Sequence, residues 1–217
     1  MILVACGLKR EAAIIQRPGV IAIAGGGDPA RLARKLDEDA DLFPVPILSS
    51  GLAGALDPLL KPGDVILGGD PGFVARLREM LPKAKVGKVI GVDRAAGTGA
   101  EKQALFRETG ALAVDMESHV ADRIARKHGL PFGIVRIVSD GADETLPPAA
   151  LVGMRPDGGV AIGKVLLSLL RQPGQTPALI RTARHAGVAF RELRRVYDVL
   201  CGGGIGGFDL REFPLDM

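Results

Sequence analysis

Residues 111–140 read ALAVDMESHVADRIARKHGLPFGIVRIVSD, and this stretch decides the fold. It opens with an apolar run, Ala111–Val114, and closes with a second, Phe132–Val138. Between them, Met116–His128 carries apolar residues at helical spacing, and Gly129 follows as a helix terminator. Because both runs are apolar at nearly every position, they suit strands buried on both faces. The stretch therefore predicts a strand, a helix and a second strand.

The same alternation continues through most of the chain. Further strand-like runs are Ile2–Cys6, Val20–Ala24, Val45–Ser49, Asp64–Leu67 and Val86–Val92. Further segments with helical spacing are Pro29–Leu36, Gly72–Met80, Glu101–Arg107 and Gly159–Arg171. The alternation predicts an α/β fold, a three-layer α/β/α sandwich around a mostly parallel, mixed central sheet.

The C-terminal part of the chain has a different pattern. From Leu179 to Leu200, apolar residues recur in steps of three and four, and most arginines lie off that stripe. Glycines crowd the segment that follows. We therefore expect a main domain at residues 1–175, an Arg-rich amphipathic helix at 176–200 packed on it, and a flexible Gly-rich tail at 201–217.

The composition limits the classes of function. With 47% hydrophobic and 24% charged residues among 217, the chain can bury one core and is not disordered. A net charge of +3 and an aromatic content of 4% argue against a nucleic-acid partner. The sequence contains no apolar run long enough to span a membrane. Two cysteines make no disulfide framework, so we expect a protein of the reducing cytoplasm.

Three carboxylates follow the ends of predicted strands. They are Glu11, Glu117 and Asp140. Because ligands of a parallel sheet bind outside the carboxyl ends of its strands, we expect the three to converge on one crevice. Each also has an ordinary structural explanation, since Glu is favoured in a first helical turn and Asp in turns and N-caps.

Two loops of small residues also follow predicted strands. The first contains Gly51, Leu52, Ala53 and Gly54, and it either approaches an anion or a sugar closely or forms an ordinary tight turn. The second, Gly25–Ala30, fits a dinucleotide pattern, but the next strand ends in serines instead of the acidic residue that such a site requires. The histidines and cysteines have no metal-ligand spacing, so we expect neither a metal nor an organic cofactor.

Four motifs give the sequence a family resemblance. They are GLKREA at 7–12, SGLAGALDPLLKPGDV at 50–65, AVDMES at 113–118 and RIVSDGAD at 136–143. Together they resemble the nucleoside phosphorylase and nucleosidase family, which cleaves N-ribosidic bonds of purine nucleosides and related compounds. PPAALVGMRPDGGV at 147–160 is similar to the branch associated with hopanoid biosynthesis. That branch implies adenosylhopane, an adenosine-type group carbon-linked to a sterol-like lipid, as the substrate.

The resemblance implies a role for each candidate residue. Glu117 would bind the ribose hydroxyls, with Met116 packed against the sugar. Asp140 would protonate N7 of the purine, for which burial would have to raise the pKa of Asp140. Glu11 would activate water, and the Gly51–Gly54 loop would lie near the ribose and the incoming nucleophile. Arg136 and Ser139 would support these groups from behind.

The resemblance leaves the nucleophile and the substrate open. Glu11 favours water because a carboxylate repels phosphate, whereas Arg10 and Arg17 could bind inorganic phosphate as a co-substrate. A small soluble nucleoside such as methylthioadenosine is the alternative substrate. A nucleoside-binding module without catalysis is the alternative from another class of function.

Other features bear on recognition and assembly. Leu52 stands where the family usually has Ser or Thr, and Arg94–Gly99, expected to meet the base, holds small residues where aromatics often stack. The basic face of Arg181–Arg195 would contact an anionic membrane at its inner face, or it is simply a solvated surface. Family members commonly form homo-oligomers, which the sequence itself does not reveal.

Overall fold

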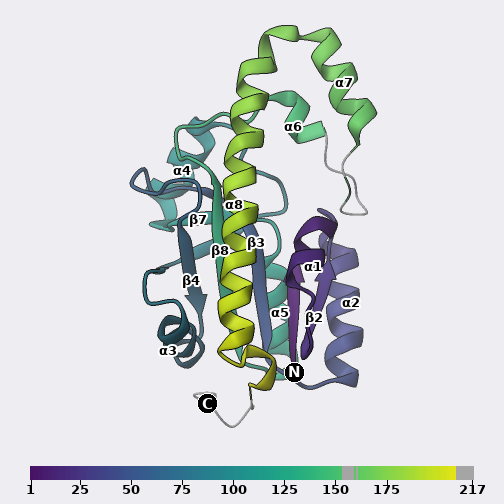
Figure 1. The fold of residues 1–217 in the computed structure, drawn as a ribbon, viewed down its shortest axis with the longest axis vertical. Coiled ribbons are helices and arrows are strands. Elements are labelled where there is room, and N and C mark those ends of the chain that lie inside the picture. Colours follow the sequence, from purple (N-terminus) through teal and green to yellow (C-terminus); the bar gives the residue numbers. More distant parts are fainter. Residues whose placement is uncertain (153–158, 160, 209–217) are drawn as a thin grey trace.

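Eight strands form one mixed sheet in the computed structural model, which describes residues 1–152, 159 and 161–208 (Figure 1). The strands are β1 Ile2–Cys6, β2 Val20–Ala24, β3 Ile47–Ala55, β4 Val65–Gly69, β5 Lys85–Val86, β6 Val89–Gly91, β7 Ala113–Asp115 and β8 Phe132–Asp140. The helices are α1 Lys9–Ile15, α2 Pro29–Leu42, α3 Pro71–Met80, α4 Gly99–Thr109, α5 Ser118–His128, α6 Pro148–Val152, α7 Ile162–Arg171 and α8 Thr176–Gly202, with 3₁₀ turns η1 Pro173–Gln175 and η2 Ile205–Gly207. The predicted α/β/α sandwich is confirmed.

Strands β3 and β8 form the centre of the sheet. They run parallel to each other, from the pair Ile47 and Phe132 to the pair Gly54 and Asp140. β1 lies parallel to β3 on its other side, and β2 lies parallel to β1. β4 runs antiparallel to β8, and β7 runs antiparallel to the end of β3. The sheet is therefore mixed, with its two longest strands flanked on both sides.

Two apolar cores, one on each face of the sheet, hold the layers together. Helices α1, α3 and α8 share a core with one face, to which β1 contributes Ile2 and Val4. Helices α2 and α5 cover the other face, to which β1 contributes Leu3 and Ala5. Four consecutive apolar residues thus serve both cores in alternation, as a strand buried on both faces requires.

The bounds of β1 and β2 are as predicted, whereas other elements differ. β3 continues to Ala55, so the predicted loop Gly51–Gly54 is wrong, and these residues belong to a strand. They stay extended because β8 pairs with them on one side and β7 pairs with the strand end. The single strand predicted at Val86–Val92 is wrong as well, because the run is divided into β5 and β6. Helix α1, which carries Glu11, was not predicted.

Helix α8 lies along one face of the sheet and extends beyond it (Figure 1). In its second half, Leu193, Val196, Tyr197 and Leu200 are buried, as the predicted stripe requires. Its first half projects from the body together with α6 and α7, and we call α6, α7 and Thr176–His185 the arm. Within the described part of the chain, we find no helix that combines the length and the apolar character needed to traverse a bilayer.

The chain after α8 packs against the body. Ile205 in η2 is fully buried, and Phe208 meets Phe73 of α3 edge to face, with ring centroids 5.6 Å apart. The prediction of a flexible tail from residue 201 is therefore wrong as far as Phe208. Residues 209–217 of that predicted tail lie outside the described residues.

Replacing Ile205 tests this packing. Ile205→Ala removes a fully buried side chain from the core under α8, so the free energy of unfolding should fall by about 2–5 kcal/mol. Urea denaturation at constant pH measures the change. Leu42→Ala is the matched control, because the Leu42 side chain at the end of α2 is 70% exposed and its loss should cost little. An Ile205→Ala variant as stable as the control would mean that this segment does not contribute to the core.

Candidate active site

A cavity of about 210 Å³ opens where β1, β3, β7 and β8 end. Glu11, Glu117 and Asp140 all line it. They come from α1, from the turn between β7 and α5, and from the last position of β8. The strand ends therefore bring together, as predicted, three carboxylates that lie far apart in the sequence.

Glu11 is held by three backbone N–H groups. Its Oε2 accepts hydrogen bonds from Gly7 N at 2.8 Å and Leu8 N at 2.7 Å, and its Oε1 accepts one from Leu52 N at 2.9 Å. The first two bonds cap the start of α1, and the third ties α1 to β3. Burial raises the pKa of Glu11, while these bonds and Arg136 lower it, and the net direction is upward. Glu11 is thus rigidly placed and more ready to accept a proton than an exposed glutamate.

Two glycines leave the room that the carboxylates occupy. A Cβ on Gly7 would lie 2.7 Å from Oε1 of Glu117, and a Cβ on Gly51 would lie 2.8 Å from Oε1 of Glu11. Gly51 also has a φ of 148°, which other residues rarely adopt. The glycines of the GLKREA and SGLAGA motifs are therefore explained by close approach to acidic side chains.

Arg136 lies behind the cavity and is completely buried. Its Nε is 2.8 Å from Oδ2 of Asp115, its Nη1 is 3.3 Å from Oε2 of Glu117, and its Nη2 donates to Ser49 Oγ at 2.7 Å. Burial works against the charge of Arg136, but Asp115, Glu117 and Glu11 outweigh it, so the pKa of Arg136 is raised. One permanent guanidinium charge therefore stands behind three buried carboxylates.

Glu117 is set by the turn before α5. Asp115 Oδ1 accepts hydrogen bonds from the N–H groups of Glu117 at 2.8 Å and Ser118 at 2.7 Å, which fixes the backbone there. The pKa of Glu117 is raised to about 8, because burial and the neighbouring carboxylates of Asp115 and Glu11 raise it more than Arg136 lowers it. The single guanidinium of Arg136 therefore does not fully compensate the buried carboxylates around Glu117.

Asp140 has a partner on each carboxylate oxygen. Ser139 Oγ lies 2.6 Å from Oδ1, and the ammonium of Lys102 on α4 lies 2.5 Å from Oδ2. Burial alone was expected to keep Asp140 protonated, and Lys102 was not among the predicted site residues. The carboxyl group of Asp140 is therefore not only buried but also in contact with an ammonium group. The sequence held one sign of this role: Lys102 lies on the buried side of the predicted helix, where a lysine is unusual.

The rest of the cavity wall is mostly apolar. Met116 and Gly27 line it near Glu117, while Ala95 and Ala96 come from the segment predicted to meet a base. Of the predicted Gly51–Gly54 group, Leu52, Ala53 and Gly54 line the cavity, and Gly51 lies behind them against Glu11. Among the described lining residues there is no aromatic side chain. The carboxylates of Glu11 and Glu117 on one side can stabilise a cation. The pair of Asp140 and Lys102 on the other side can supply a proton to a departing group.

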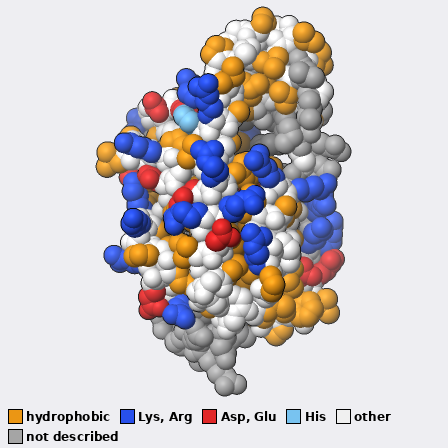
Figure 2. Space-filling view, in the orientation of Figure 1, with side chains coloured by type: hydrophobic (Ala, Val, Ile, Leu, Met, Phe, Trp, Pro, Cys, Tyr) orange, Lys and Arg blue, Asp and Glu red, His pale blue; other side chains and the backbone are white. Residues whose placement is uncertain are grey.

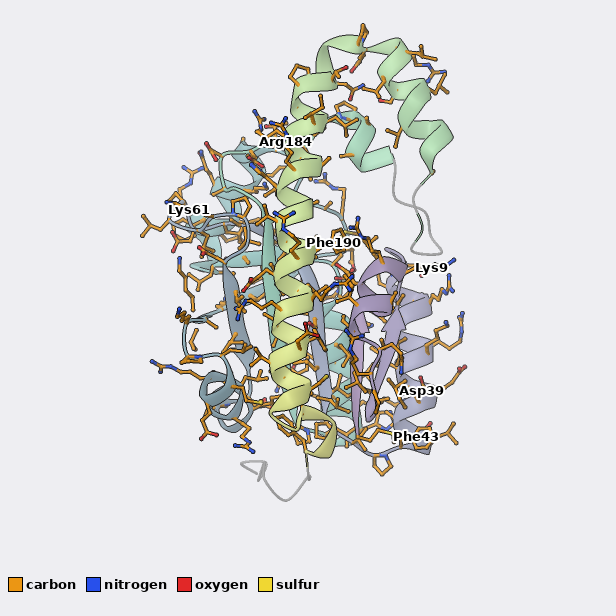
Figure 3. All side chains as sticks on the ribbon, in the orientation of Figure 1. Lys9, Asp39, Phe43, Lys61, Arg184 and Phe190 are labelled. Atoms are coloured by element: carbon orange, nitrogen blue, oxygen red, sulfur yellow. The ribbon has the colours of Figure 1, made fainter. Side chains whose placement is uncertain are left out.

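The predicted phosphate ligands lie elsewhere. Arg10 stacks over the ring of Phe190 on α8, with its Cζ 4.0 Å from the ring centroid, and Figure 3 labels Phe190. Arg17 pairs with Asp198 at 3.7 Å. Neither residue lines the cavity, so the suggestion that they bind phosphate there is wrong.

A larger groove of about 710 Å³ runs between α3, α5 and β6. Its charged groups are engaged already, since Arg126 pairs with Asp122 and Asp70 accepts from Phe132 N at 2.7 Å. We therefore place the candidate site in the smaller cavity. Among the described residues, no cluster of three or more His, Cys, Asp or Glu is arranged to hold a metal ion.

The sequence of the central segment matches a known family. Residues 68–171 match the model of the phosphorylase superfamily. This segment includes the AVDMES and RIVSDGAD motifs, with Glu117 and Asp140. Among proteins of curated function, none matches the chain in sequence.

The fold is similar to that of solved nucleosidases. A mutant of the Helicobacter pylori 5′-methylthioadenosine/S-adenosylhomocysteine nucleosidase, solved with 5′-methylthioadenosine in the active site, matches with a TM-score of 0.63 at 16% identity, covering 91% of this chain and 97% of that chain. The futalosine hydrolase of the same organism matches with 0.62 at 17%, with the same coverage. The S-adenosylhomocysteine nucleosidase of Streptococcus pyogenes matches with 0.60 at 18%, covering 88% and 95%. The family model thus matches the central segment of the chain, and the solved structures share its fold.

The buried state of Glu117 predicts a pH effect on stability. Folding raises the pKa of Glu117 from 4.5 to about 8, so the folded protein binds this proton more tightly than the unfolded chain. The resulting stability is fully present below the unfolded value and is lost as the pH rises toward 8. Glu117→Gln, which cannot ionise, should therefore flatten the decline of the free energy of unfolding across this range.

Urea denaturation at a series of pH values between about 5 and 9 measures the free energy of unfolding over the range in which this effect is expected. Glu38→Gln on the exposed side of α2 is the matched control and should keep the wild-type slope. If Glu117→Gln lost stability with pH as steeply as the control, the assignment of that proton to Glu117 would be wrong.

Proposed function

We propose that the protein is an enzyme that cleaves the N-ribosidic bond of purine nucleosides and releases the base. The observation that carries the proposal is the convergence of Glu11, Glu117 and Asp140 on one cavity with an otherwise mostly apolar wall. The phosphorylase-superfamily match over residues 68–171 supports it, because that segment contains two of these carboxylates. The neighbouring structures add support, since their names describe nucleosidases and a futalosine hydrolase.

The chemistry follows from the charges in the cavity. Breaking the N-ribosidic bond creates positive character on the sugar and negative charge on the base. Glu117, with Met116 beside it, binds the ribose and stabilises the cation. Asp140 faces the base and delivers a proton to N7, so that the base leaves neutral. Glu11 accepts the proton of the attacking water, for which its raised pKa suits it.

Water is the nucleophile that the charges favour. Glu11 and Glu117 line the cavity, whereas Arg10 and Arg17 lie outside it. Arg136 is already paired with Asp115 and Glu117. A phosphate dianion would therefore enter a site with no unpaired cation among the described lining residues, which is unfavourable. Phosphorolysis, with inorganic phosphate as co-substrate, is the alternative outcome of the assay.

For the substrate we propose an adenosine group linked to a lipid, as in adenosylhopane. The resemblance of residues 147–160 to the hopanoid branch motivates this, and half of that stretch, residues 153–158 and 160, lies outside the described residues. The arm offers a second argument, because Leu167, Leu170 and Ile180 expose 47%, 81% and 48% of their surface. Such side chains suit contact with lipid. A small soluble nucleoside such as methylthioadenosine is the alternative.

Basic residues accompany the apolar ones on the arm. Figure 2 shows hydrophobic side chains over the arm and a group of Lys and Arg along α8, and Figure 3 labels Arg184 near the base of the arm. Arg171, Arg181 and Arg184 are all exposed. Together these residues would attract the arm to an anionic membrane surface, where a lipid-linked substrate resides.

Asp140→Asn tests the assigned chemistry. An amide cannot pass a proton to N7, so the rate of adenine release should fall about 100-fold or more, the contribution typical of a general acid. Incubation of the full chain with adenosine-type nucleosides and detection of free adenine measures the rate, and repeating it with phosphate shows whether ribose 1-phosphate forms. Asp41→Asn, at an exposed position of α2, should keep wild-type activity. Adenine release that survives Asp140→Asn would refute the mechanism, and nucleoside binding without release by the wild type would favour the non-catalytic module.

The lipid-linked substrate and the arm can be tested together. The full chain should sediment with phosphatidylglycerol vesicles at low salt and less so at high salt, because screening weakens the attraction. Leu167→Glu with Leu170→Glu should abolish this binding. Leu42→Glu with Leu59→Glu is the matched control, since those side chains are 70% and 77% exposed but lie outside the arm.

Substrate preference decides the same question independently. An adenosine with a long apolar 5′ substituent should be turned over faster than methylthioadenosine. Equal or better turnover of methylthioadenosine, together with no vesicle binding at either salt concentration, would replace the lipid-linked substrate by a soluble nucleoside.

A further inference from the structure

Lys102 is a completely buried lysine on α4. The helix begins in a capping box, in which Glu101 N donates to Thr98 Oγ1 at 3.2 Å and Thr98 N donates to Glu101 Oε2 at 3.1 Å. Glu101 Oε2 also accepts from Gly97 N at 2.9 Å. The start of α4 is therefore fixed, and the next residue, Lys102, is directed into the protein at the end of β8.

The ammonium group of Lys102 has an acceptor for each of its three protons. It donates to Asp140 Oδ2 at 2.5 Å, to Gly141 O at 2.7 Å and to Glu144 O at 3.0 Å. The two carbonyl oxygens can only accept, and a carboxylate can only accept as well. The three protons of an ammonium ion match these three acceptors, so the contacts suit a pair of Lys102 ammonium and Asp140 carboxylate.

The contact between Lys102 and Asp140 bears on where the proton for the departing base comes from. A carboxylate in contact with an ammonium ion has no proton of its own to give to the base. Its other oxygen, Oδ1, is already held by Ser139 Oγ at 2.6 Å. Asp140 lines the cavity, whereas Lys102 does not, so Lys102 cannot touch the base itself. A proton that reaches the base from this side passes through Asp140.

We propose that Lys102 is the source of the proton that Asp140 delivers to the departing base, an inference that rests on the proposed function. As the bond between the sugar carbon and N9 of the purine breaks, its electron pair leaves with the base. One proton moves from Lys102 Nζ to Asp140, and Asp140 passes this proton on to N7. Water adds to the sugar carbon and gives a proton to Glu11. After the base departs, that proton returns through solvent and Asp140 to the neutral Lys102 amine, so the cycle is balanced.

The contacts of Lys102 suit both of its charge states. As an ammonium ion it donates three hydrogen bonds. As a neutral amine it keeps two protons for Gly141 O and Glu144 O, and its lone pair then accepts from the protonated Asp140. No buried polar group loses its partner when the proton moves, so the transfer avoids the usual cost of an unsatisfied group.

Other titratable groups stand near this pair. Glu11 and Glu117 lie in the same cavity wall as Asp140. Glu144, whose carbonyl holds Lys102, pairs through its side chain with His185 on α8 at 2.9 Å. Because several of these groups titrate, the test compares variants at each pH and does not rely on one profile alone.

Two substitutions separate proton supply from a structural role. Lys102→Met removes both the charge and the proton, and Lys102→Arg keeps a cation for Asp140 but holds its proton too tightly to give it up. If Lys102 supplies the proton, both variants release adenine about 100-fold more slowly than the wild type, with KM little changed. If Lys102 only positions Asp140, the arginine variant restores the rate, which would overturn the proposal. Lys85→Met is the matched control, since Lys85 pairs with Asp64 at 3.0 Å on the surface.

Two further readouts depend on the proton and not on the fold. Lys102→Met should regain part of its adenine release as the pH falls, because Asp140 without its ammonium partner then takes a proton from solvent. Both variants should cleave 4-nitrophenyl riboside at nearly the wild-type rate, because that leaving group departs as a stable anion. Equal losses on both substrates, or no loss on the purine nucleoside, would overturn the proposal. Failure of the wild type to release adenine would instead refute the proposed function.

Discussion

The site depends on the burial of one guanidinium group. Arg136 has no exposed surface, and it lies on β8 within reach of Asp115 and Glu117, with Glu11 nearby. Three carboxylates without this cation would repel one another in a place where water cannot screen them. Arg136 is held in turn by Ser49 on β3, so the two central strands of the sheet fix the position of the charge. Acidic groups can therefore line the cavity because Arg136, on a central strand of the sheet, is their counterion.

The fold places the remaining groups by the lengths of its strands. β3 and β8 extend beyond their neighbours, and Asp140 is the last residue of β8. The end of β3 meets β7, which leads directly into Asp115 and Glu117. Glu11 of helix α1 lies at the same cavity, because its carboxylate accepts hydrogen bonds from the N–H groups of Gly7, Leu8 and Leu52. Residues from both ends of the domain thus meet without any long loop.

The sequence predicted the parts of this site that depend on strand ends. Glu11, Glu117 and Asp140 were expected to converge because each follows an apolar run, and β1 and β2 were predicted with their observed bounds. The extension of β3 through Gly51–Gly54 could not be predicted, because small residues are typical of turns and only pairing with β7 and β8 keeps them extended. Lys102 was missed because one lysine in a helix resembles a solvated residue until Asp140 and two carbonyl oxygens are seen around it. Ile205 was missed because the glycines around it suggest mobility.

The two sides of the cavity differ in charge, and that difference is suited to breaking a bond between a sugar and a base. Near Glu117 one guanidinium faces three carboxylates, and the pKa of Glu117 rises to about 8 because burial leaves its charge poorly compensated. At Asp140 one carboxylate faces one ammonium, so that side is balanced. A sugar that acquires positive character would supply the missing cation beside Glu117, and a base that acquires negative charge would draw a proton from the balanced pair. In the proposed reaction, the charges of the cavity are therefore better compensated in the transition state than in the ground state, which is the condition for catalysis by preorganised charge.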